Sequence, residues 1–397
     1  MELYGVLLVA IVAAEVAMRV GLRLLAKQDG LIAFDEVPTI TPAALDRFFD
    51  HGFDPELGWI RKPNTRKKDM GRFAYSIDAR GSRVNPGHEH LPVGVVTVGD
   101  SYTFCREVED ADTWQWGLAE RLQTNVLNFG VGNYGFDQAL LRLEREFPTA
   151  PAPIVVMGVV PSTIARILSV WKHYNEYGNF FAFKPRYVLE HGALRLRPTP
   201  VTSRNDFFRL AEILPGVQAH DEFYRTRFLR EAFRAPYLLS AMRNWRRLAL
   251  APAKAARRIG PRLGLDEAPF AALVTALDSG GAGQTARLFA EPGPAALLDA
   301  LVGEFVAMGQ RLGFTPVLLI MPMKDDLYLM QRRGHFYRNF VDRAARRLPV
   351  VDAADALLAS GNVRALFREW HYNPAGNARV AQLLADRLST LNLRDRL

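Results

Sequence analysis

Residues 93–108 read VGVVTVGDSYTFCREV, and the rest of the chain is organised around this stretch. Its first half is apolar and rich in β-branched residues up to Gly99, which predicts a short buried strand of a parallel sheet. Gly99, Asp100 and Ser101 predict a sharp turn into a helix. Open α/β sheets place their sites at the carboxyl ends of strands, where a helix start offers free N–H groups. Ser101 is therefore a candidate nucleophile, although Asp100 and Ser101 could instead simply cap the helix.

Strand and helix patterns alternate on the carboxyl side of this stretch, break off, and return near the end of the chain. They predict an α/β fold, a three-layer sandwich on a mostly parallel five-stranded sheet. The further strands expected are 125–129, 154–160, 315–321 and 349–352, and the helices are 113–122, 136–146, 295–312, 326–348 and 374–391. Residues 166–295 interrupt the rhythm and are expected to form an insertion or cap between two parts of the core, 93–165 and 296–397.

Composition restricts the class of protein. With 397 residues, 49% of them hydrophobic, the chain can build a large core and exceeds one minimal domain. The single cysteine, Cys105, excludes an internal disulfide framework and a cysteine zinc site, and we expect neither metal nor cofactor.

Residues 204–262 hold thirteen Arg/Lys and five Asp/Glu, so they account for the net charge of +8. Such a region suits an anionic surface or is simply a solvated helical face, and no module for specific nucleic-acid binding accompanies it.

An apolar run opens the chain. Leu3–Ala14 is uninterrupted, and Glu15, Arg19, Arg23 and Lys27 follow at helical spacing. We expect residues 1–27 to be a membrane anchor helix rather than a buried amphipathic helix or a cleaved signal peptide. The basic residues that follow the span place the bulk of the chain in the cytoplasm by the positive-inside rule.

Two motifs resemble a known family. Residues 99–103, GDSYT, resemble block I of the SGNH (GDSL-type) hydrolases, and residues 370–377, WHYNPAGN, resemble block V. The resemblance implies an SGNH/flavodoxin-like fold in which Ser101 is the nucleophile and His371 the general base. The family's acid lies three residues before the histidine, where this chain has Arg368. The related alginate-type O-acetyltransferases have their acid two residues before the histidine, so this resemblance implies that Glu369 orients the imidazole; the alternative is a Ser-His dyad completed by a backbone carbonyl.

The glycine-rich stretch 130–135, GVGNYG, resembles block II, and Gly135 fits it directly. The resemblance implies that the N–H of Asn133 joins the N–H of Ser101 in an oxyanion hole. Block III of the family carries an asparagine that is absent here, so Ser162 or Thr163 would have to replace its side-chain donor. The same stretch also reads as a dinucleotide fingerprint, but the next strand ends without the acid that would hold a ribose.

The lead-in segment, 28–92, resembles a membrane-anchored group within the family. Leu57-Gly58-Trp59 and Lys62-Pro63-Asn64 match its motifs, to which we assign packing roles only. The resemblance implies a serine esterase or O-acyltransferase that acts on an acylated glycan or lipid. It also implies an extracytoplasmic location, in conflict with the charge bias. The alternative is a catalytically weakened SGNH-like domain that binds a glycan, a lipid or a protein.

Overall fold

The computed structural model describes residues 2–26 and 30–391. Its centre is a five-stranded sheet whose strands are all paired in parallel. The strands are β5 (Val93–Gly99), β6 (Asn125–Asn128), β7 (Ile154–Val159), β10 (Thr315–Ile320) and β11 (Val350–Asp352). Their spatial order is β11-β10-β7-β5-β6, which is the flavodoxin-like arrangement with the first strand between the second and the third. The predicted sheet is confirmed.

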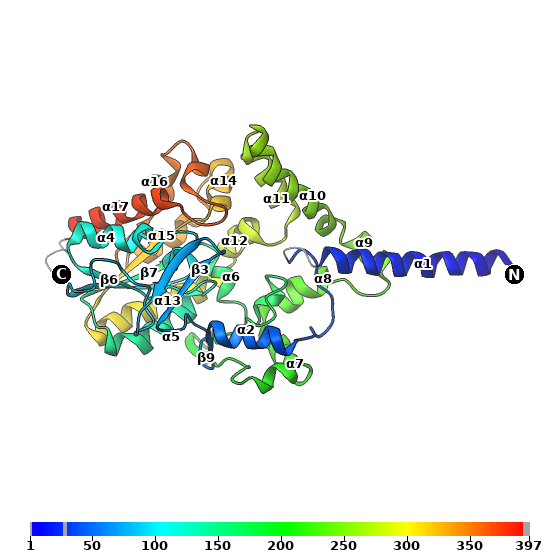
Figure 1. The fold of residues 1–397 in the computed structure, drawn as a ribbon, viewed down its shortest axis with the longest axis horizontal. Coiled ribbons are helices and arrows are strands. Elements are labelled where there is room, and N and C mark those ends of the chain that lie inside the picture. The colour runs from blue at the N-terminus through cyan, green and yellow to red at the C-terminus, as the bar shows by residue number, and fades with distance from the viewer. Residues whose placement is uncertain (1, 27–29, 392–397) are drawn as a thin grey trace.

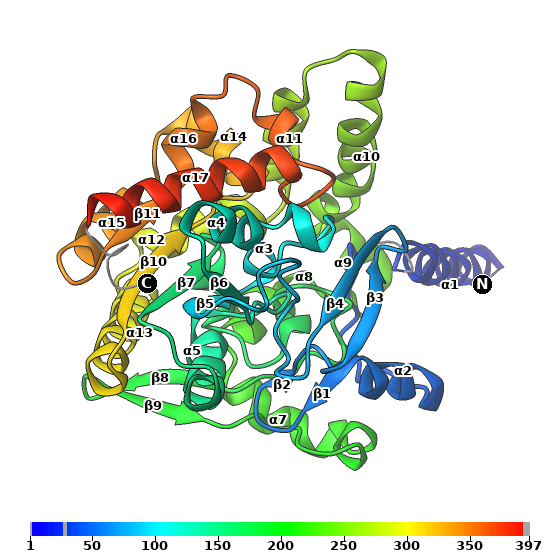
Figure 2. The same cartoon turned by 60° about the vertical axis from the view of Figure 1, so that its left-hand side comes forward.

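Helices cover both faces of the sheet and make it the middle of three layers (Figures 1 and 2). On one face lie α4 (Trp114–Leu122) and α17 (Pro374–Thr390), which pack against each other. On the other face lie α5 (Phe136–Glu146), α13 (Pro292–Leu312) and α15 (Arg338–Ala345). Every residue of β7 is buried, as expected for a strand covered on both sides.

The helix expected over 326–348 is two helices, so that expectation was wrong. The first is α14 (Lys324–Arg333), and α15 begins only at Arg338. Gly334 follows α14 with φ +80°, a backbone conformation that glycine adopts without steric cost and that ends a helix.

Small elements surround the sandwich. The lead-in forms α2 (Pro42–Gly52) and two antiparallel hairpins, β1 (Phe53–Asp54) with β2 (Gly58–Trp59) and β3 (Thr65–Asp69) with β4 (Phe73–Ile77). Between β7 and α13 the chain adds a hairpin and a set of helices. They are α6 (Thr163–Arg166), β8 (Arg186–Glu190), β9 (Ala193–Arg197), α7 (Leu210–His220), α8 (Leu229–Glu231), α9 (Tyr237–Arg243), α10 (Trp245–Ile259), α11 (Glu267–Leu277) and α12 (Gly281–Ala290).

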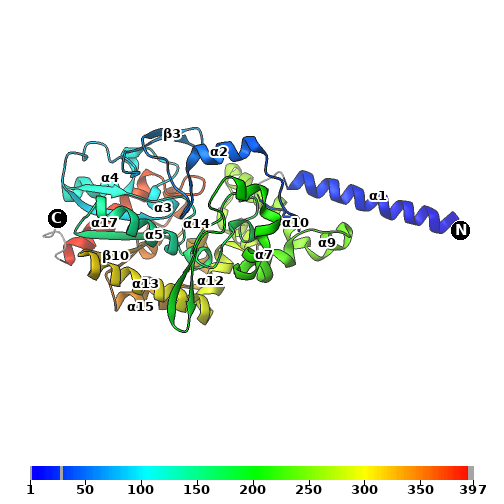
Figure 3. The ribbon, with the colours of Figure 1, turned by 90° about the horizontal axis from the view of Figure 1, so that it is seen from below.

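Helix α1 (Glu2–Leu25) projects from the body and is long and apolar enough to cross a membrane (Figures 1 and 3). Its residues 3–14 are all exposed. Glu15 accepts hydrogen bonds from the backbone N–H groups of Tyr237 and Leu238 and so caps α9. Lys27 lies outside the described residues.

Candidate active site

Ser101 is the first residue of the four-residue helix α3 (Ser101–Phe104), directly after β5. Asp100 fixes the turn through both carboxylate oxygens. Oδ1 accepts from the N–H of Tyr102 at 2.8 Å, and Oδ2 accepts from the N–H of Val160 and from Arg166, each at 3.0 Å. Asp100 therefore caps the helix and ties it to the end of β7, which positions the serine.

Gly99 allows the end of β5 to lie close to Gly158 in the neighbouring strand β7. Its φ is +152°, and a Cβ there would lie 1.9 Å from the carbonyl oxygen of Gly158. No residue with a side chain fits this contact without moving the backbone. The close approach of the two strand ends thus depends on this glycine.

His371, from the last part of the chain, lies next to the serine turn. Its Nε2 lies 2.9 Å from Ser101 Oγ, although the two residues are 270 positions apart in sequence. The ring of Tyr102 lies 4.9 Å from the imidazole, centroid to centroid, and its hydroxyl donates to the carbonyl of Trp370. Asn373 caps α17 by accepting from the N–H of Gly376. The histidine is therefore held between the serine turn and the start of a long helix.

The carboxylate beside His371 belongs to Glu107. Its Oε1 lies 2.8 Å from His371 Nδ1, while its Oε2 accepts from the backbone N–H groups of Glu369 and Trp370 at 3.0 and 3.3 Å. The expectation that Glu369 orients the imidazole is thus wrong. The side chain of Glu369 is exposed. Glu369 instead donates its backbone N–H to the Glu107 carboxylate, which is the group that contacts the imidazole.

Glu107 is buried and its backbone is in the left-handed region, with φ +65°. Burial alone would raise the pKa of its carboxyl, but the hydrogen bonds from His371 and the two backbone N–H groups outweigh burial and lower it. The N–H of Glu107 donates to Asp69 Oδ2, so the strained residue is tied to β3. One sequence signal could have found it: Glu107 is the first carboxylate after the serine, six residues on and directly before the apolar Val108.

Two backbone N–H groups are available for an oxyanion. Among the described residues, neither Ser101 nor Asn133 donates its N–H to a backbone or side-chain acceptor. Trp59 Nε1 donates to the carbonyl of Gly132 at 2.9 Å. Because a trans peptide directs its C=O and N–H to opposite sides, this bond aims the Asn133 N–H away from Trp59. Asn133 has φ +69°, a conformation that asparagine tolerates.

The residues expected to replace the missing asparagine do not contact the nucleophile. Thr163 is buried, and its hydroxyl accepts from the N–H of Phe136 at 2.9 Å, which joins α6 to α5. Ser162 is half-buried, and no hydrogen bond of its hydroxyl to the described residues is found. Gly135 caps α5, where a Cβ would lie 2.5 Å from Asp137 Oδ1. Thr163 and Gly135 therefore shape the loops around the site.

A pocket of about 330 Å³ adjoins the serine at Gly132. Aromatic side chains, small residues and three basic side chains form its wall. The lining residues are Phe48, His51, Gly52, Trp59, Ile60, Arg61, Arg106, Val131, Gly132, Asn133, Gly178, Asn179, Phe180, Phe181 and Ala182. Trp59 and Arg61 come from the lead-in, which therefore contributes to the wall of this pocket. Within the described parts of the chain, no cluster of three His, Cys, Asp or Glu side chains could hold a metal ion.

No protein-family model and no curated protein sequence matches the chain. Similar solved structures include a lipase/acylhydrolase from Enterococcus faecalis, with 11% identity, a TM-score of 0.33, and 76% of this chain and 97% of that chain covered. A catalytic mutant of an acetylxylan esterase from Geobacillus stearothermophilus has 11% identity, a TM-score of 0.34, and coverages of 77% and 96%. A G-D-S-L family member from Veillonella parvula has 10% identity, a TM-score of 0.32, and coverages of 77% and 100%. Scores this low carry no argument about function, which therefore rests on the geometry above.

Proposed function

We propose that this chain is a serine-dependent esterase or O-acyltransferase of the SGNH type. The observation that carries the proposal is the hydrogen-bonded series from Glu107 through His371 to Ser101. A nucleophile, a base within hydrogen-bond distance, and a third group that orients the base make up the constellation used for acyl transfer. An acylated glycan or lipid is the proposed substrate, on the resemblance of the sequence motifs.

The proposed reaction has two halves. His371 Nε2 takes the proton of Ser101 Oγ as that oxygen attacks the acyl carbonyl, and Glu107 stabilises the imidazolium. The N–H groups of Ser101 and Asn133 bind the oxyanion of the tetrahedral intermediate. His371 then protonates the departing alkoxide, which leaves an acyl-serine. Water or an acceptor hydroxyl attacks that ester with His371 as base and releases the serine.

A fluorophosphonate probe tests this proposal on the full chain. Such a probe forms a covalent bond only with an activated serine, so the wild type should be labelled and Ser101→Ala should not. Ser203→Ala, in an exposed turn, is the matched control and should be labelled like the wild type. Labelling that survives Ser101→Ala would place the reactive serine elsewhere.

One observation favours a second function. Neither Ser162 nor Thr163 forms a hydrogen bond with Ser101 among the described residues, and the Thr163 hydroxyl is held by the N–H of Phe136, so the two backbone N–H groups are the donors that the geometry supports. Loss of one such donor costs about 3 kcal/mol of transition-state stabilisation. A folded protein that no fluorophosphonate labels would therefore be assigned to the alternative, a weakened SGNH-like domain that binds a glycan, a lipid or a protein.

We further propose that α1 anchors the chain as a single membrane span and that α9 and the start of α10 lie at the lipid surface. The exposed part of α1, Leu3–Ala14, is about 18 Å long at 1.5 Å per residue, against a hydrocarbon core of about 30 Å. Its remainder packs beside α9, so α9 reaches the depth of Glu15 (Figure 1). Exposed apolar side chains on α9 and at the start of α10 would then contact lipid: Leu239, Met242 and Trp245.

The basic stretch 204–262 is only partly free to meet an anionic surface. Six of its thirteen basic residues form ion pairs with carboxylates: Arg204, Arg209, Arg227, Arg234, Arg247 and Arg257. Four others are exposed on or just after α9 and α10: Arg243, Arg246, Arg258 and Arg262. Of these, Arg243 and Arg246 flank Leu239, Met242 and Trp245, an arrangement that suits an anionic lipid surface.

Quenching of tryptophan fluorescence by brominated lipids tests this placement. The fluorescence of each tryptophan is the difference between the wild type and the variant that lacks it, Trp245→Phe or Trp370→Phe. In vesicles, the fluorescence of Trp245 should be strongly quenched, whereas that of Trp370 should not. Trp370 is as exposed as Trp245 but lies beside His371, so it serves as the matched control. Equal quenching of the two signals would contradict a lipid-facing start of α10.

A further inference from the structure

The pocket beside Ser101 contains an arginine that forms no ion pair among the described residues. Arg61 Nη1 donates to the hydroxyl of Tyr75 at 3.2 Å, and its guanidinium lies 4.5 Å from the ring of Phe104. No carboxylate forms an ion pair with it among the described residues, and its Nε is buried without a hydrogen-bond partner. Burial, the largest influence, lowers the pKa of Arg61, which reflects the cost of a charge held away from water.

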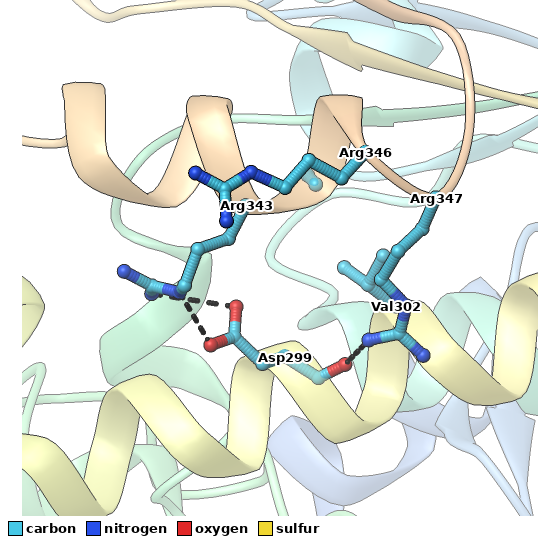
Figure 4. Close-up of a pocket in the computed structure, with 6 residues that line it drawn as sticks. Asp299, Val302, Arg343, Arg346 and Arg347 are labelled. Carbon is cyan, nitrogen blue, oxygen red and sulfur yellow. Dashed lines mark hydrogen bonds and ion pairs between the residues drawn. The ribbon is translucent and has the colours of Figure 1, made fainter.

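Three other arginines that line cavities, Arg106, Arg343 and Arg347, each bind an aspartate, whereas Arg346 beside the second cavity is exposed. Arg106, across the same pocket, makes three hydrogen bonds to the carboxylate of Asp69. In a second cavity, of about 260 Å³ between α13 and α15, Arg343 binds the carboxylate of Asp299 and Arg347 its carbonyl (Figure 4). Arg61, unlike Arg106, forms no ion pair within the described part of the chain, and no Asp or Glu lines the pocket.

The Arg61 guanidinium lies close to the nucleophile. A Cβ built on Gly132 would be 3.8 Å from Arg61 Nη2 and 3.9 Å from Ser101 Cβ, so both groups border the same small space. Trp59, Phe180 and Phe181 add apolar and aromatic surface to the pocket. A group bound there would be within reach of an ester held at Ser101, on the side that faces β2.

We propose that this pocket binds a carboxylate carried by the ester substrate, and that Arg61 recognises it. The inference rests on the proposed esterase function and narrows its substrate class to acidic esters with one negative charge near the scissile bond. A single unpaired guanidinium matches a single carboxylate in charge, and a hydrogen bond to a charged acceptor is stronger than one to a neutral acceptor. The aromatic side chains then contact the carbon skeleton between the carboxylate and the ester.

Two matched esters test the proposal: phenyl acetate, which is neutral, and 4-acetoxybenzoate, which carries a carboxylate one ring away from its ester. In Arg61→Gln, kcat/KM should fall more than tenfold for 4-acetoxybenzoate and less than twofold for phenyl acetate. Arg61→Lys should keep part of the preference because it keeps the charge. Arg66→Gln, on the exposed face of β3, is the control and should change neither value. Equal losses on both esters would overturn the proposal and place Arg61 at the oxyanion or in the fold.

A binding measurement separates this inference from the proposed function. Benzoate should bind to the Ser101→Ala protein in a calorimetric titration, and Arg61→Gln in that background should weaken it at least tenfold. If the wild type hydrolyses neither ester while benzoate binding depends on Arg61, the esterase proposal fails and the carboxylate pocket stands. If benzoate binding is absent or indifferent to Arg61, the carboxylate pocket is wrong whatever the esters show.

Discussion

Glu107 Oε1 lies 2.8 Å from His371 Nδ1, and Glu107 follows the candidate nucleophile by only six residues. The nucleophile and the acid therefore share one loop at the end of β5, while the base comes from the far end of the chain. The loop that carries His371 is in turn bound to Glu107 by two backbone N–H groups. Because one carboxylate holds both the imidazole and its loop, its loss should affect the position of the base as well as its charge.

Glu107→Gln should lower kcat for an activated ester by about a hundredfold to ten-thousandfold. The amide is nearly isosteric, but it cannot stabilise an imidazolium, and its NH₂ group would face the backbone donors of residues 369 and 370. The measurement is steady-state hydrolysis of 4-nitrophenyl acetate, with circular dichroism to verify folding.

Glu369→Gln is the matched control for this substitution. Its exposed side chain makes no contact with the imidazole, so kcat should stay within twofold of the wild type. A large loss in Glu369→Gln together with a small loss in Glu107→Gln would reverse the assignment of the acid.

Asp69→Asn should impair catalysis from outside the site. Asp69 binds Arg106 through both oxygens and accepts the N–H of Glu107, so it is a positioning residue for the acid. We expect kcat to fall about tenfold, with the pH profile of kcat displaced, because the pKa of the Glu107 carboxyl depends on its hydrogen bonds. Asp46→Asn, which removes an exposed ion pair with Arg204, should leave kcat and its pH profile unchanged.

The sheet was predictable because its strands are short runs of buried aliphatic and β-branched residues. Residues 154–159, for example, are apolar or glycine and flanked by proline-containing turns. Ser101 and His371 were predictable from their motifs, and the structure brings them within 2.9 Å. The break at Gly334 is marked in the sequence only by the glycine itself, because the helical pattern resumes after it.

The acid was not predictable from spacing alone. Arg368 and Glu369 precede the histidine, and nothing in their order indicates that a carboxylate 264 residues away occupies the site. Glu107 reaches it through a left-handed backbone turn whose N–H is bound by Asp69, the last residue of β3, 38 positions earlier in the chain. The contribution of Arg61 to the pocket escapes sequence analysis for the same reason, because it depends on a hairpin seated against the sheet.

Asp326→Asn should flatten the pH dependence of stability. Asp326 is fully buried with one unpartnered oxygen, and burial, with a contribution from the nearby Asp325, raises its pKa to about 7. Between its ordinary pKa and about 7, the folded state retains a proton that the unfolded state has lost. The free energy of unfolding therefore falls as pH rises through this range. The amide is neutral throughout and can still accept from the N–H of Met323.

Thermal unfolding at about pH 5 and about pH 8 measures this difference, since the two values lie on either side of the pKa of Asp326. The Tm of Asp326→Asn minus that of the wild type should become more positive from the lower to the higher pH. Asp342→Asn, on α15, is the control, and its difference from the wild type should not change with pH. If the wild type and Asp326→Asn kept a constant difference, Asp326 would be ionised throughout this range.

Gly99→Ala should destabilise the whole fold. The new methyl group would meet the carbonyl oxygen of Gly158 at 1.9 Å and the hydroxyl of Thr103 at 2.4 Å, and both partners are fixed by the sheet and by α3. We expect a loss of about 3 kcal/mol or more in the free energy of unfolding, measured by urea titration. Gly293→Ala, in the first turn of α13 with nothing within 4 Å of its Cβ, should be neutral or slightly stabilising. Equal stabilities of the two variants would show that β5 and β7 are free to separate at the serine turn.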